Sequence, residues 1–117
     1  MLKLIAISSM LIGIIFSARA NSNECNISGI WNHSAKPATL FINLIRGEIS
    51  VHSHELNPES IGLVVLKNLK LGTTHLYWNA QMYSAAEDSF VDVQITSTNC
   101  TQLSVSFNND QVLKLIR

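Results

Sequence analysis

Apolar and polar residues alternate with a period of two along most of this chain, and this pattern decides the fold class. Period two is typical of half-buried β-strands, because successive side chains of a strand point to opposite faces. Clear examples lie at 40–44, 49–51, 91–95 and 103–107. After residue 20 we find no convincing 3.6-residue period of an amphipathic helix. The sequence therefore predicts an all-β protein.

Turn-forming residues divide the alternating pattern into short strands. Arg46-Gly47, Asn57-Pro58 and Asn108-Asn109 are examples of these breaks. An antiparallel meander has two unpaired edges unless it closes, so we predict a small up-and-down barrel of about eight strands, with an open sheet or a two-sheet sandwich as the alternative. The predicted strands are 28–33, 38–45, 48–54, 62–69, 75–83, 89–97, 102–107 and 111–117.

The first 20 residues have the pattern of a targeting segment. Lys3 precedes the mostly apolar run 4–16, and Ala18-Arg19-Ala20 places small residues where a signal-peptide cleavage site requires them. The apolar run is shorter than the ~20 residues that span a bilayer. We expect a helical signal peptide at 1–20 and one secreted or periplasmic domain at 21–117, with no membrane span after cleavage. An uncleaved membrane anchor is the alternative.

Cys25 and Cys100 are the only cysteines in the chain. Export to an oxidising compartment favours a disulfide between them. The closed loop would stabilise the fold by roughly 4 kcal/mol in the chain-entropy account. Two free thiols are the alternative, and a catalytic thiol is disfavoured because neither cysteine lies in a C-x-x-C motif.

Gly29-Ile30-Trp31 opens the first predicted strand, and Arg117 ends the last one. This arrangement resembles the lipocalin type, which has a G-x-W in the first strand and a basic residue in the last. The resemblance implies that Arg117 packs over Trp31 at the closed end of the barrel. A guanidinium over an indole would contribute about 0.5–2 kcal/mol and tie the first strand to the last.

The middle of the chain resembles a narrower group, the small secreted bacterial proteins of uncharacterised function with a lipocalin-like barrel. The segments that carry this resemblance are Asn57-Pro58, the apolar run 62–66, the Trp-centred strand 78–83 and Leu103-Ser104-Val105. The resemblance implies a barrel fold and a secreted location, and it implies no established activity.

Charge and motifs disfavour several classes of function. The chain has 8 Lys and Arg against 8 Asp and Glu, a formal charge of zero, which disfavours a nucleic-acid binder that neutralises phosphates. It contains no P-loop or dinucleotide fingerprint, so no cofactor is predicted. We also find no motif that pairs a nucleophile with a histidine, so we predict that the protein is not an enzyme.

His52 and His54 are the most specific candidates for metal binding. Positions i and i+2 of a strand share a face, so both imidazoles are expected to project together, with Glu48 on the same side. Two histidines and a carboxylate suit zinc or copper. Because Ile49 and Val51 occupy the opposite face, an exposed polar face without metal is the alternative.

The predicted strand 75–83 has an apolar face and a face that mixes tyrosines with amides. The apolar face comprises Leu76, Trp78, Ala80 and Met82, and the other comprises Tyr77, Asn79, Gln81 and Tyr83. Tyrosine gives a large contact area with few rotatable bonds, so the second face is a candidate contact surface. We select Trp78, Met82 and Tyr83 as candidate ligand-binding residues, the first two lining a small cavity near one mouth of the barrel.

These observations predict a monomeric, non-catalytic binding protein that holds a small apolar ligand. Eight strands enclose an interior that side chains nearly fill, which leaves little room for a pocket of about 300 Å³ or more. A module that binds a protein partner, such as an inhibitor or a host-facing factor, is the alternative.

Overall fold

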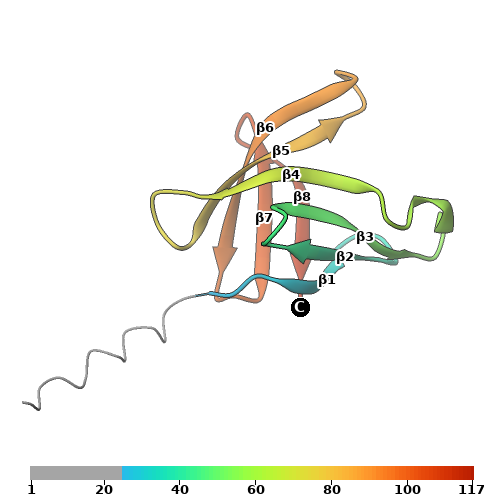
Figure 1. Ribbon diagram of the computed structural model, residues 1–117, viewed down its shortest axis with the longest axis horizontal. Coiled ribbons are helices and arrows are strands. Elements are labelled where there is room, and N and C mark those ends of the chain that lie inside the picture. The colour runs from blue at the N-terminus through green and yellow to red at the C-terminus, as the bar shows by residue number, and fades with distance from the viewer. Residues whose placement is uncertain (1–24) are drawn as a thin grey trace, which may run out of the picture.

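The computed structural model describes residues 25–117, so the predicted signal peptide helix at 1–20 lies outside the described residues. Eight antiparallel strands follow one another around a closed barrel in the order β1 to β8 (Figure 1). The prediction of an up-and-down barrel is confirmed, and the open-sheet and sandwich alternatives are wrong. The strands are β1 (Gly29–His33), β2 (Ala38–Asn43), β3 (Glu48–His54), β4 (Val64–Leu71), β5 (Tyr77–Ser84), β6 (Ser89–Thr98), β7 (Gln102–Phe107) and β8 (Asp110–Ile116).

β4 differs from its predicted bounds at both ends, running from Val64 to Leu71 rather than from 62 to 69. This strand begins at Val64 rather than at Gly62, because a short 3-10 helix, η3 (Pro58–Ser60), and the turn that follows it occupy the preceding residues. Gly62 has a φ of 93°, which favours glycine, and its N–H donates to the Val51 carbonyl at 2.8 Å. The turn that precedes β4 therefore already hydrogen-bonds to β3.

Side chains from all eight strands fill the interior of the barrel. Most apolar residues of the alternating segments are buried, whereas Leu44, Trp78, Met82 and Val91 are partly buried and pack against the core. The largest fully buried side chains are Trp31, Ile27, Ile42, Ile49, Leu66, Ile95, Leu103, Leu115, Val93 and Val105. The centre of the barrel is a packed core.

The β7–β8 turn uses asparagine where the backbone is left-handed. Asn108 and Asn109 join β7 to β8 with φ values of 51° and 70°, and Phe107 pairs with Asp110 on either side of them. Two consecutive positive φ values define the type I′ turn, whose twist matches that of the adjoining strands. Asparagine tolerates this conformation better than most residues, so the sequence favours a tight hairpin here.

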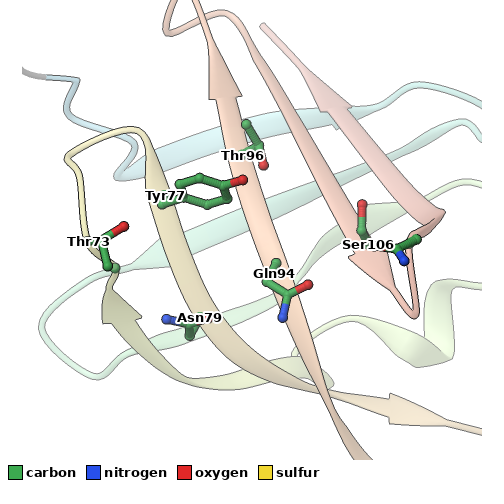
Figure 2. A pocket seen from close by; sticks show the side chains of 8 residues that line it. Thr73, Tyr77, Asn79, Gln94, Thr96 and Ser106 are labelled. Carbon is green, nitrogen blue, oxygen red and sulfur yellow. The ribbon is translucent and has the colours of Figure 1, made fainter.

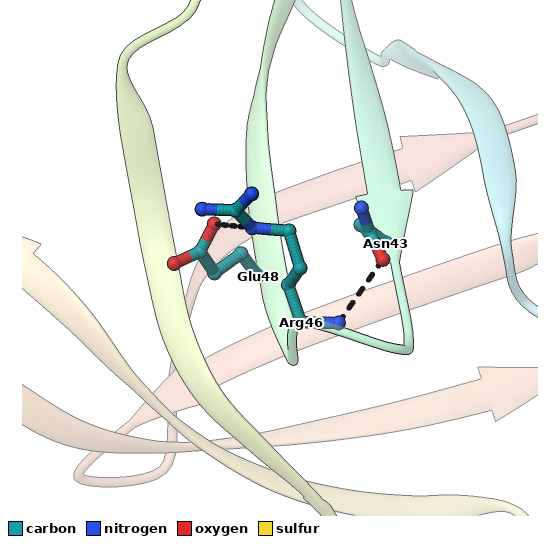
Figure 3. A network of polar contacts seen from close by, with 3 residues as sticks. All are labelled: Asn43, Arg46 and Glu48. Carbon is teal, nitrogen blue, oxygen red and sulfur yellow. Dashed lines mark hydrogen bonds and ion pairs between the residues drawn. The ribbon is translucent and has the colours of Figure 1, made fainter.

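The β2–β3 hairpin orients two charged side chains (Figure 3). The backbone N–H of Arg46 donates to Asn43 Oδ1 at 3.1 Å, and Arg46 Nε lies 3.4 Å from Glu48 Oε1. An exposed ion pair of this kind contributes between 0 and about 1 kcal/mol. The ion pair places the Glu48 carboxylate next to Arg46 at the turn.

One end of the barrel, which we call the disulfide end, is closed by the segment 25–28. Cys25 and Cys100 form a disulfide with a Cα–Cα distance of 5.5 Å, which confirms the predicted pairing and excludes two free thiols. The bond joins the residues before β1 to the turn between β6 and β7. The buried Ser97 hydroxyl lies 3.3 Å from Cys25 Sγ.

Arg117 and Trp31 pack together at this same end. The Arg117 guanidinium carbon lies 4.1 Å from the centroid of the Trp31 ring, as the lipocalin-type resemblance implies. The guanidinium also donates to the backbone carbonyls of Asn26, Ser28 and Cys100, at 2.7, 3.4 and 3.2 Å. Trp31 Nε1 donates to a further backbone carbonyl, that of Ile27, at 2.9 Å. Arg117 thus links the end of β8 to the segment that precedes β1.

Candidate functional site

An apolar cavity of about 160 Å³ lies at the opposite end of the barrel, which we call the mouth end. It opens between the end of β5, the beginning of β6, the end of β7 and the beginning of β8. Its walls are Met82, Tyr83, Ser84, Val91, Val93, Phe107 and Val112. We call it the mouth cavity.

Strand alternation and cross-strand register bring these residues together. Met82 pairs with Val91, and this pair lies two residues nearer the mouth end than the buried pair of Ala80 and Val93. The β7–β8 register shifts by one residue between Val105 and Ser106, since Val105 pairs with Leu113 but Ser106 pairs with Gln111. Val112 is the extra residue of this β-bulge, and it becomes part of the cavity wall.

The mouth cavity suits an apolar group of limited size. Most of its wall is aliphatic or aromatic, and no charged side chain lines it. An engineered apolar cavity of about 150 Å³ in another protein binds benzene, so about this volume accepts one small ring. The polar side-chain groups among the lining residues are the hydroxyls of Ser84 and Tyr83.

The side chain of Tyr83 is held at the rim by two neighbours, Asp88 and Phe90, and Phe90 is in turn contacted by Lys67. Its hydroxyl donates to Asp88 Oδ1 at 2.9 Å, and its ring packs edge-to-face on Phe90 with centroids 5.8 Å apart. Lys67 Nζ lies 4.0 Å from the Phe90 centroid. The hydrogen bond to the Asp88 carboxylate raises the pKa of the Tyr83 hydroxyl, with a smaller contribution from burial.

The structure brings together two of the three predicted ligand-binding residues. Met82 and Tyr83 line the mouth cavity, whereas Trp78 does not. Trp78 lies four residues earlier in β5, about 13 Å along the strand at ~3.3 Å per residue. It pairs with Leu71 and Ile95, and its buried Nε1 has no hydrogen-bond partner among the described residues.

Sequence reasoning assigned other cavity residues to the core. Val91 and Val93 belong to the alternating segment 91–95 and face the interior, but alternation does not show which inward residues lie at a mouth. Which inward residues lie at a mouth depends on the register between neighbouring strands. Ser84 and Val112 are not among the ligand-binding candidates from the sequence. Val112 reaches the cavity wall because of the β-bulge in β8.

A bulge also changes the surroundings of the two candidate metal ligands. Thr39 pairs with Ser53 but Leu40 pairs with Val51, so His52 is an extra residue in β3. The alternation that was expected to put His52 and His54 on one face is interrupted there. His54 Nδ1 accepts the Asn57 N–H at 3.2 Å.

Residues 25–117 contain no group of three or more His, Cys, Asp and Glu side chains placed to hold a metal ion. The Glu48 carboxylate, expected as a third ligand, contacts Arg46 instead. Metal binding by His52 and His54 stays a prediction. Calorimetric titration with zinc, comparing the wild type with a His52→Ala, His54→Ala double variant, tests it.

A third histidine, His33, lies close to His54 at the mouth end. Ala38 of β2 pairs with His54 of β3. The next residue of β2, Thr39, pairs with Asn32, which directly precedes His33. His33 Nδ1 accepts the Ala35 N–H at 3.0 Å. Burial, and then the positive charges of Lys36 and His54, lower the pKa of His33 from its ordinary value of 6.5.

Comparison with known proteins adds no relative to this description. No family model, curated protein or solved structure matches the chain. The likeness to lipocalins and to the small secreted bacterial group therefore stays a prediction based on short motifs. Among residues 25–117, no helix has the length and hydrophobicity needed to cross a bilayer.

Proposed function

We propose that this protein is a non-catalytic binding protein that holds a small apolar ligand in the mouth cavity. The observation that carries this proposal is the cavity itself, with its apolar wall and its position at the open end of a barrel. Binding would bury a hydrophobic group against Met82, Val91 and Phe107, which is favourable at about 25 cal/mol per Å² of apolar surface removed from water.

The volume of the cavity limits the ligand. Pockets that enclose drug-sized molecules measure roughly 300–1,000 Å³, whereas the mouth cavity measures about 160 Å³. Val93, which lines the cavity, is 1% exposed and belongs to the packed core, so the cavity ends at the core. The ligand is therefore one small ring or short aliphatic chain, or the apolar end of a larger molecule.

The Cys25–Cys100 disulfide supports a secreted or periplasmic location for this function. Disulfides persist in oxidising compartments and are rare in the cytosol. The signal-peptide pattern at 1–20 leads independently to the same location.

Binding of a protein partner remains the second candidate, and the β3–β4 loop is the observation that favours it. Leu56, Ile61 and Leu63 are all exposed in this short loop around η3. Exposed aliphatic side chains grouped in one loop are typical of interaction sites. In this version the mouth-end loops, rather than the cavity, make the contact.

Titration of methyl-labelled protein with toluene tests the first proposal. We expect saturable chemical-shift changes at the methyl groups of Met82, Val91 and Val93. Val91→Phe fills the cavity and should abolish binding while the fold is retained. Leu44→Phe is the matched control, because Leu44 is also partly buried against the core and does not line the mouth cavity. Toluene binding by Val91→Phe as tight as that by the wild type would contradict the proposal.

A further inference from the structure

The outer surface of the barrel carries a second hollow, which lies on the other side of the sheet from the core. It is open, measures about 410 Å³ and spans β5, β6 and β7 (Figure 2). Its lining consists of Gly72, Thr73, Tyr77, Asn79, Gln94, Thr96, Ser106 and Asn109. We call it the outer groove.

Strand register arranges the polar side chains of the outer groove in rows. Asn79 pairs with Gln94, and Gln94 pairs with Ser106, so these three residues form one row across three strands. Tyr77 pairs with Thr96 in the neighbouring row. Figure 2 shows the Tyr77 ring extending from β5 toward β6, with Thr73 on its other side.

The chemistry of the outer groove favours an uncharged ligand rich in hydroxyl groups. None of its eight lining residues is charged, so it supplies neither a cation for a phosphate or carboxylate nor a carboxylate for a metal ion. Amide and hydroxyl side chains both donate and accept hydrogen bonds, as sugar hydroxyls do. Tyr77, which is 45% exposed, adds an aromatic face to this polar lining.

A second polar hollow of about 300 Å³ continues the outer groove across β4, β5 and β6, and its lining includes the oppositely charged side chains of Lys70 and Asp92. The two hollows share Asn79. Within the second, Asn68 Nδ2 donates to Gln81 Oε1 at 2.7 Å, and Gln81 Nε2 donates to Asp92 Oδ1 at 3.4 Å. A polar strip therefore runs across four strands, which suits a ligand with repeated polar units.

We propose that the outer groove binds a neutral oligosaccharide. The Tyr77 ring stacks on the apolar face of one sugar, and Asn79, Gln94 and Thr96 hydrogen-bond to its hydroxyl groups. The adjoining hollow takes the next sugar of the chain. The volume lies within the range of small-molecule sites. A protein partner is disfavoured, because the centres of protein interfaces are apolar and enriched in Arg, Met and several aromatic side chains.

Gly72 positions Tyr77 within the outer groove. Its N–H donates to the Tyr77 carbonyl at 2.8 Å. A Cβ at Gly72 would lie 3.0 Å from the Tyr77 Cβ and 3.1 Å from its carbonyl oxygen. Gly72→Ala should therefore displace Tyr77 without removing any group that bonds the sugar. This site is independent of the mouth cavity, so either proposal can fail alone.

Titration of ¹⁵N-labelled protein with cellotriose, maltotriose and chitotriose tests the inference, with trigalacturonate as the charged comparison. We expect at least one neutral trisaccharide to give saturable shifts at the amides of Tyr77, Asn79, Gln94 and Thr96. Tyr77→Ala should weaken that binding by about tenfold, and Gly72→Ala should weaken it to a lesser degree. Phe41→Ala is the control, because Phe41 is an exposed aromatic residue of β2, 37% exposed, outside both hollows.

Any of the following results would overturn the inference. The first is that none of the three neutral sugars gives saturable shifts. The second is that the shifts fall outside the two hollows, or that trigalacturonate binds more tightly than every neutral sugar. The third is a Tyr77→Ala protein that keeps a wild-type spectrum away from the substitution and binds as tightly as the wild type.

Discussion

At the disulfide end of the barrel, a disulfide bond joins the segment before β1 to the β6–β7 turn, and the Arg117 guanidinium packs on the buried Trp31 indole and so links the end of β8 to β1. The mouth end has no comparable link among the described residues. Trp31 is fully buried beneath Arg117, and Arg117 donates to three backbone carbonyls. At the mouth end, the cavity replaces part of the packing, and the β3–β4 loop exposes Leu56 and Ile61.

This difference separates the residues that stabilise the barrel from the proposed ligand site in the mouth cavity. Loops and cavities that bind ligands are drawn from the less stable parts of a protein, since they need fewer internal contacts. Interactions at the disulfide end provide stability that does not depend on the shape of the mouth. Substitutions at the two ends should therefore differ in their effect on the stability of the fold. Five measurements compare these effects.

Removing the disulfide should have the largest effect. A Cys25→Ser, Cys100→Ser double variant loses a covalent link with a sequence separation of 75 residues, and the chain-entropy account gives a loss of roughly 4 kcal/mol in the free energy of unfolding. Urea denaturation of the oxidised wild type and the variant measures it. A loss below about 1 kcal/mol would show that the disulfide end does not anchor the barrel.

Trp31→Phe should come next, with a loss of about 2 kcal/mol. The substitution removes the hydrogen bond from Nε1 to the Ile27 carbonyl and leaves a small void under Arg117. The same denaturation experiment on Met82→Leu, a change of similar shape at the mouth, should show a loss of less than about 1.5 kcal/mol. Equal losses in the two variants would contradict the proposed division between the ends.

Arg117→Ala should cost about 1 kcal/mol, chiefly through the lost contact with the Trp31 ring. Arg117→Lys keeps the charge but lacks the planar fork that reaches the carbonyls of Asn26 and Ser28. It should therefore recover only part of the stability. Thermal unfolding of the three proteins at one pH measures the series, and full recovery by lysine would assign the effect to charge alone.

Adding one methylene group should have opposite effects at the mouth and in the core. Val91→Leu extends into the mouth cavity and should stabilise the fold by about 0.5 kcal/mol. Val105→Leu overpacks a fully buried position and should destabilise the fold. The midpoints of urea unfolding compare the two variants, and destabilisation by Val91→Leu would show that the cavity does not accommodate added atoms.

The smallest effect concerns pH. The folded chain lowers the pKa of His33 below 6.5, the value for the unfolded chain, so the unfolded state binds the proton first as the pH falls. Stability from this group is present above about pH 6.5 and is lost as the pH falls through the lowered pKa. Comparing urea midpoints at about pH 8 and about pH 5 should give a smaller difference for His33→Gln than for the wild type.

The residue pattern predicts most of this fold, because each strand has a buried face and an exposed face. The bounds predicted for β3 and β7 agree with those observed, 48–54 and 102–107. The pairing of Cys25 with Cys100 was predictable because no other cysteine competes. The contact between Arg117 and Trp31 followed from a family likeness rather than from alternation.

The candidate sites were less predictable, because they depend on register and on bulges. Nothing local in the sequence marks His52 or Val112 as an extra residue, yet each bulge changes which side chains share a surface. The separation of Trp78 from Met82 follows from simple strand geometry once the end of the barrel is known. The outer groove needs residues from β5, β6 and β7 in register, and alternation along one strand supplies only Tyr77 and Asn79.

From the short seam between β1 and β8, we expect the disulfide to protect the protein from aggregation. Only two residue pairs join these strands, Asn32 with Ile116 and His33 with Leu115, and the Ser34 N–H adds a bond to the Lys114 carbonyl. Opening of this seam would expose two unpaired strand edges, which are templates for association with another chain. Because the disulfide and Arg117 act close to the seam, they limit how far it can open. Reduction should therefore promote intermolecular β-sheet assembly before the rest of the barrel unfolds.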